Sequence, residues 1–269
     1  MTTTRARKAK EALPFTTKET AEILELVKGS GSVELKLSVP VTGHRATIAS
    51  IGLDPVEAQP RQTFFFDTPD LALNKAGLIV RARRVQGGSA DTVIKLRPVD
   101  PATIDPELRR SDSFKVELDV MPGKFVCSAS VKGVCTGEEV LEVTAGKAKN
   151  RSLFSKEQRA FYDEHAPAGI DLNSLSILGP IFVLKAKHRP KDYDQRIVVE
   201  LWLYPDGSRI LEISTKSPPA DAFLVAAQFK AWLAGKGLAL NGNQTTKTSS
   251  ALEIMSAELK SPRRPAKSP

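Results

Sequence analysis

The stretch SVELKLSV, from Ser32 to Val39, places an apolar residue at every second position. The apolar set begins with Val33, and the alternate positions include Glu34 and Lys36. A period of two indicates a β-strand with one apolar face and one charged face. The fold depends on whether the charged face points to water or into the protein.

Seven further segments alternate in a similar way, so the sequence predicts eight strands. These segments are Gln62–Asp67, Leu78–Arg84, Thr92–Arg97, Ser113–Val120, Phe182–Arg189, Ile197–Tyr204 and Arg209–Lys216. Helix signals flank or separate the strands: a capping box at Thr16–Glu19, a largely helical segment over 138–168, and an apolar stripe over 218–233.

The charged residues of each predicted strand project from one face, as Arg81 and Arg83 do on either side of Ala82. A solvated sheet face is the simple interpretation, but it normally mixes charge signs, and here basic residues dominate. A closed barrel accounts for both faces, because helices cover the apolar outside and the charged inside lines a passage. We therefore expect an α+β protein: an eight-stranded antiparallel β-barrel, or tunnel, with helices packed on the outside.

Several basic groups that converge on one axis favour binding of a polyanion such as triphosphate or polyphosphate. The predicted phosphate-binding residues are Arg81, Arg83, Lys95, Arg97, Lys115, Lys185, Lys187 and Lys216. Mg²⁺ or Mn²⁺ is the expected cofactor, because hard ions that accompany phosphate chains take carboxylate ligands. The predicted metal ligands are Glu34, Glu117, Asp119, Glu200 and Glu212.

Length and composition indicate one domain over 16–257, between disordered basic tails at 1–15 and 258–269. The chain has 269 residues, is 41% hydrophobic and carries a formal net charge of +8, which implies anionic partners. No apolar run is long enough for a membrane helix. Two cysteines without metal-site spacing are typical of a reducing compartment, so we expect a cytoplasmic protein. The three histidines show no catalytic or metal spacing.

Two blocks of the sequence resemble the CYTH superfamily, the triphosphate tunnel metalloenzymes. Residues 32–36 are similar to the Glu-x-Glu-x-Lys opening of that family, and residues 62–71 with 76–83 are similar to its second block. The resemblance covers about residues 32–255 and implies a tunnel that binds a triphosphate-bearing substrate. It also implies that Glu34 and Lys36 are catalytic residues of the first strand, and that Glu212 and Lys216 form part of the site.

Two departures from the family pattern keep the function open. Ser32 stands where the first glutamate of the opening motif is found, and Ser214 stands where a second glutamate often follows Glu212. A serine hydroxyl brings no charge to a metal. One hypothesis is a metal-dependent phosphohydrolase that acts on inorganic or organic triphosphate. The other is a non-catalytic polyphosphate- or nucleotide-binding module. Nucleic-acid contact through the basic tails is a third and less favoured interpretation, and the sequence leaves the oligomeric state open.

Overall fold

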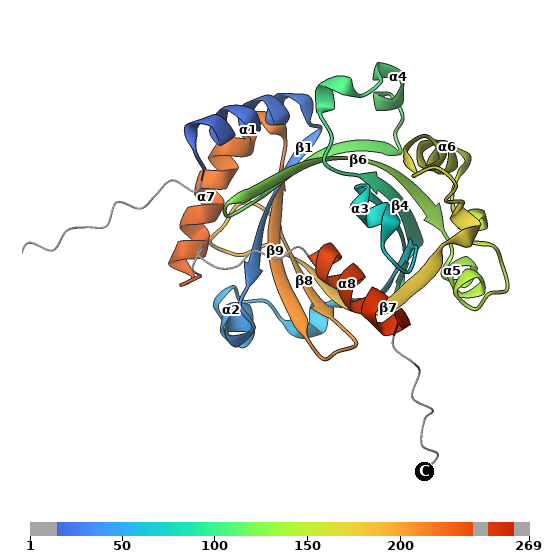
Figure 1. Cartoon of the computed structure of the whole chain (residues 1–269). Helices are drawn as coiled ribbons and strands as arrows, with labels where there is room; N and C mark the ends of the chain where they lie inside the picture. The colour runs from blue at the N-terminus through green and yellow to red at the C-terminus, as the bar shows by residue number, and fades with distance from the viewer. Residues whose placement is uncertain (1–14, 239–246, 261–269) are drawn as a thin grey trace, which may run out of the picture.

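A closed β-barrel forms the centre of the molecule. The structure, a computed structural model, describes residues 15–238 and 247–260. Within these ranges, nine strands close in the order β1-β5-β6-β4-β3-β2-β7-β8-β9 (Figure 1). The strands are β1 (Ser32–Val39), β2 (Gln59–Asp67), β3 (Leu78–Val85), β4 (Ala90–Leu96), β5 (Phe114–Met121), β6 (Lys124–Cys135), β7 (Ser176–His188), β8 (Ile197–Leu203) and β9 (Arg209–Ser217).

The barrel class is confirmed, but the prediction of eight antiparallel strands is wrong. The strand missing from the prediction is β6, whose small residues, such as Ser128 and Ala129, give a weak strand signal. Directions cannot alternate all the way around a ring with an odd number of strands, so one neighbouring pair must be parallel. That pair is β1 and β5, with Glu34 opposite Asp119.

Eight helices accompany the barrel in the described ranges. They are α1 (Thr17–Gly29), α2 (His44–Ser50), α3 (Ala72–Lys75), α4 (Pro106–Arg109), α5 (Gly137–Thr144), α6 (Lys156–His165), α7 (Ala222–Gly235) and α8 (Lys247–Lys260). The predicted capping box is present, because Thr16 Oγ1 accepts the Glu19 N–H at 3.2 Å and the Glu19 carboxylate accepts the Thr16 N–H. The segment 138–168 is largely helical, as predicted, since α5 and α6 lie there.

The larger hydrophobic core lies between the outer face of the barrel and the helices around it. Val33 and Leu35 of β1, for example, belong to the same core as Val27 of α1 and Phe229 of α7. The apolar face of the opening strand therefore points outward under helices. Its charged face points into the barrel, which confirms the interpretation of the alternation.

A second hydrophobic core lies on the inner face of the barrel, around α8. Phe65 of β2 and Trp202 of β8 project from the same strand faces as the inward-pointing charged residues. They pack with Leu252 and Met255 of α8. The C-terminal helix is thus packed against the inner wall of the barrel, where it lies near β7 and β8 (Figure 1).

Both predicted tails fall largely outside the described residues. Phe15, the last residue of the predicted N-terminal tail, packs edge-on against Phe125 of β6. Helix α8 continues to Lys260, three residues into the predicted C-terminal tail. Among the described residues, no helix is both long and apolar enough to cross a bilayer.

Candidate functional site

All five predicted metal ligands lie on the inner face of four neighbouring strands, β8, β9, β1 and β5. We call this part of the wall the carboxylate side; its members are Glu34, Glu117, Asp119, Glu200 and Glu212. The strand registers bring like charges together, because Glu34 lies opposite Asp119 and Glu200 lies opposite Glu212. Opposed carboxylates repel each other, so each pair needs a cation between its members.

Lys36 bridges the first pair. Its Nζ lies 3.2 Å from Glu34 Oε2 and 3.0 Å from Asp119 Oδ2. Burial alone would lower the pKa of Lys36, but the Asp119 and Glu34 carboxylates outweigh it and hold that pKa well above its usual value. Ser214 Oγ donates a hydrogen bond of 3.0 Å to Glu34 Oε1. The hydroxyl that replaces a family glutamate therefore supports Glu34.

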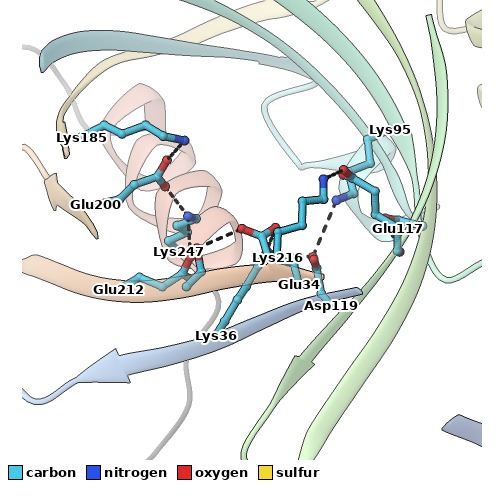
Figure 2. Close-up of polar contacts among 12 residues, drawn as sticks. Glu34, Lys36, Lys95, Glu117, Asp119, Lys185, Glu200, Glu212, Lys216 and Lys247 are labelled. Carbon is cyan, nitrogen blue, oxygen red and sulfur yellow. Dashed lines mark hydrogen bonds and ion pairs between the residues drawn. The ribbon is translucent and has the colours of Figure 1, made fainter. Parts of the chain in front are cut away.

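Lys247 bridges the second pair, and it comes from α8 rather than from the barrel wall (Figure 2). Its Nζ contacts Glu200 Oε2 and lies 2.7 Å from Glu212 Oε1. Lys185 Nζ holds the other Glu200 oxygen at 2.8 Å. Burial would raise the pKa of Glu200, but the Lys247 and Lys185 charges hold it well below its usual range.

The remaining carboxylate, Glu117, also has lysine partners. Lys216 Nζ contacts Glu117 Oε1, and Lys132 Nζ lies 3.7 Å from the same oxygen. Burial would raise the pKa of Glu117, but the Lys132 and Lys216 charges lower it to about 2. Every member of the carboxylate side therefore has at least one lysine partner.

The opposite part of the wall, on β2, β3 and β4, carries arginines. We call it the arginine side; its members are Arg61, Arg81, Arg83 and Lys95 on these strands, and Arg97, which directly follows β4. Arg83 forms a two-pronged pair with Asp91, with nitrogen–oxygen distances of 2.9 to 3.1 Å. Among the described residues, Arg61, Arg81 and Arg97 have no carboxylate partner, and the buried Nε atoms of Arg61 and Arg81 lack a hydrogen bond.

Arg81 is the least compensated of these cations. Burial first, and then the neighbouring Arg83 charge, lowers the pKa of Arg81 to about 9, so it remains charged at neutral pH. A buried cation with no counter-ion destabilises the protein unless an anion binds it. The arginine side therefore has the electrostatics of an anion site.

Some predicted site residues lie away from this centre. Lys115 and Lys187 are exposed, and Lys216 is half exposed, so the structure does not bring these lysines to the arginine side. Arg61 was missed because the predicted strand began at Gln62, whereas β2 begins at Gln59. Lys247 had a signal that the prediction did not use: it lies on the same helical stripe as Ala251 and Met255, which are both buried.

The carboxylate side does not match a metal centre as it is arranged. Over residues 15–238 and 247–260, no three His, Cys, Asp or Glu side chains form a group that could hold a metal ion. His44, His165 and His188 each place a ring nitrogen 2.9 to 3.0 Å from a backbone carbonyl oxygen. Because lysine ammonium groups already occupy the carboxylates, the Mg²⁺ or Mn²⁺ expected from the sequence stays a prediction.

Comparisons with known proteins establish the fold. No family model matches the chain, and no curated protein is similar enough to count as a relative. Among solved structures, a Hippeastrum protein described as a putative adenylyl cyclase with a dominant triphosphatase activity is 17% identical, with a TM-score of 0.57 over 82% of this chain and 94% of that chain. A putative adenylate cyclase from Bacillus halodurans is 12% identical, with a TM-score of 0.58 over 82% of this chain and 98% of that chain. The chain therefore has the fold of these adenylate cyclase-like proteins, in agreement with the resemblance to the CYTH superfamily.

Proposed function

We propose that the tunnel binds the triphosphate group of inorganic triphosphate or of a small organic triphosphate. The observation that carries the proposal is Arg81, a half-buried cation whose Nε atom is fully buried; it lies beside Arg83 and has no carboxylate partner in the described part of the chain. An anion bound at Arg81 would offset this uncompensated charge and satisfy its Nε.

The charge balance of the tunnel supports an anion with several phosphates. Ten cations and six carboxylates make up the two sides and their paired partners, so positive charge is in excess. The cations are Arg61, Arg81, Arg83, Lys95, Arg97, Lys36, Lys132, Lys185, Lys216 and Lys247, and the carboxylates are the carboxylate side together with Asp91. The excess lies mainly on three adjacent strands, which suits a chain of phosphates rather than a single one.

Hydrolysis of the bound triphosphate is the second candidate function. Asp119 favours it, because its Oδ1 is buried and accepts no hydrogen bond from any described residue, which leaves an acceptor for a water molecule. Glu34 and Lys36 lie beside Asp119 and are the candidate catalytic residues. The triphosphatase activity described for the Hippeastrum protein, which shares the fold, supports the same candidate. The rival is a tunnel that binds triphosphate without turnover.

Thermal unfolding and phosphate release together test both candidates. Inorganic triphosphate in EDTA should raise the melting temperature more than pyrophosphate or phosphate does, because only the native state gathers the arginines. No stabilisation by triphosphate at millimolar concentration would contradict the proposed binding. Phosphate release in Mg²⁺, Mn²⁺ or EDTA then separates the two candidates: release supports hydrolysis, and binding without release supports a binding module.

A further inference from the structure

Lys247 is held inside the barrel by the helix that it begins. Ala251, Leu252 and Met255 of α8 are buried in the inner hydrophobic core. Tyr204 Oη donates a hydrogen bond of 2.9 Å to the Lys247 backbone carbonyl, and Lys247 Nζ lies 5.5 Å from the centre of the Trp202 ring. These contacts fix the ammonium group at one place in the tunnel.

That place is the point at which Glu200 and Glu212 converge. Lys247 Nζ contacts one oxygen of each carboxylate, and the Glu34 charge also acts on it. The strand register sets Glu200 directly opposite Glu212, so the two carboxylates require a cation whatever its identity. An ammonium group and a divalent ion cannot share this point, because both would contact the same oxygens.

We propose that Lys247 is a built-in cation that takes the place of a divalent metal between Glu200 and Glu212, so that the tunnel binds triphosphate without a metal at this pair. The part concerning triphosphate rests on the proposed function; the part concerning the cation does not. Removal of the ammonium group leaves two opposed carboxylates with Glu34 near them; Glu200 keeps Lys185 on its other oxygen, and Glu212 loses the lysine that contacts it. Carboxylate oxygens of this kind, completed by water, are ligands for Mn²⁺ or Mg²⁺.

The test is Mn²⁺ binding by the full-length chain without phosphate, measured by calorimetry and by the electron paramagnetic resonance of free Mn²⁺. Wild type should not bind Mn²⁺ at this pair. Lys247→Met should gain a Mn²⁺ site whose affinity exceeds that of any Mn²⁺ binding by wild type by about tenfold or more. Adding Glu212→Gln to Lys247→Met should remove the gain. Lys236→Met is the matched control, because it removes one lysine charge from an outer pair with Asp192.

Equal Mn²⁺ affinity in wild type and Lys247→Met would overturn the proposal, as would a gain that survives Glu212→Gln. Wild type gives a second test that does not depend on how the variant folds. Stoichiometric Mn²⁺ binding to wild type that Glu212→Gln abolishes would overturn the proposal, and its absence would support it. These measurements contain no phosphate, so they show whether Lys247 excludes Mn²⁺ from Glu200 and Glu212 even if the proposed triphosphate binding fails.

Discussion

The two sides of the tunnel wall satisfy their charges in different ways. On the carboxylate side, Lys36 lies between Glu34 and Asp119, and Lys247 lies between Glu200 and Glu212. On the arginine side, Arg83 pairs closely with Asp91, and Lys95 lies 3.7 Å from Asp119. Every carboxylate of the carboxylate side therefore has a lysine partner, whereas Arg61, Arg81 and Arg97 of the arginine side have no carboxylate partner among the described residues.

This difference assigns separate tasks to the two sides. Paired buried charges offset much of each other's desolvation, whereas an isolated buried charge retains that cost. The carboxylate side therefore contributes to the fold of the empty tunnel, and the arginine side provides most of the affinity for an anion. Substitutions on the two sides should consequently affect different measurements.

The largest expected effect is on the arginine side. Arg81→Ala should weaken binding of inorganic triphosphate by about 100-fold, because it removes charge-assisted hydrogen bonds to the anion. Calorimetric titration in EDTA measures the change. Arg84→Ala is the matched control, since Arg84 points out of the barrel from the same strand and donates to Gln62.

Stability of the unliganded protein provides a second check on the same substitution. Arg81 lies half-buried beside Arg83 and has no carboxylate partner among the described residues, so Arg81→Ala should not lower the melting temperature in the absence of ligand. A large loss of stability with unchanged triphosphate affinity would show that Arg81 supports the fold rather than the anion site.

The next effect concerns the pH dependence of stability on the carboxylate side. The folded-state pKa of Glu117 is lowered from 4.5 to about 2, so its contribution is present above pH 4.5 and is lost as the pH falls towards 2. Between pH 6 and pH 2.5, wild type should lose about 2 kcal/mol more unfolding free energy than Glu117→Gln does. Urea unfolding at both pH values measures this difference.

The matched control for this pH effect is Glu107→Gln. The Glu107 pair with Arg110 lies on the surface, with both side chains 73% exposed, and exposed pairs contribute little to stability. Its loss between the two pH values should equal that of wild type. If Glu117→Gln behaves in the same way as this control, the pairing of Glu117 with Lys132 and Lys216 does not stabilise the fold.

The inner face was predictable from sequence because period-two alternation is a local property of each strand. The alternation around Glu34 and around Arg81 correctly placed both residues inside the barrel. Strand β6 was not predicted, because small residues such as Ser128 and Ala129 give it the composition of a loop. Once this strand was missed, the parallel contact between β1 and β5 could not be anticipated.

The pairing of the charges was not predictable, because it depends on register and closure rather than on local pattern. Glu200 and Glu212 lie on two strands whose residues become opposed only when the hairpin forms. Lys247 reaches them from a helix 35 residues beyond Glu212 in the chain. The sequence therefore indicated carboxylates that could hold a metal, and the structure shows that lysines hold them.

The smallest expected effect tests whether the carboxylate side opposes the anion at all. Glu34→Gln should tighten triphosphate binding by about threefold, because a repelling charge is removed while Lys36 keeps its contact with Asp119. Titration beside Glu25→Gln, which removes an exposed carboxylate paired with Lys28 on α1, controls for the change in net charge. If the tunnel also hydrolyses triphosphate, Glu34→Gln should abolish phosphate release although binding is retained. Weaker binding in Glu34→Gln than in Glu25→Gln would mean that Glu34 positions the cations that hold the anion, and the division of tasks between the two sides would then be wrong.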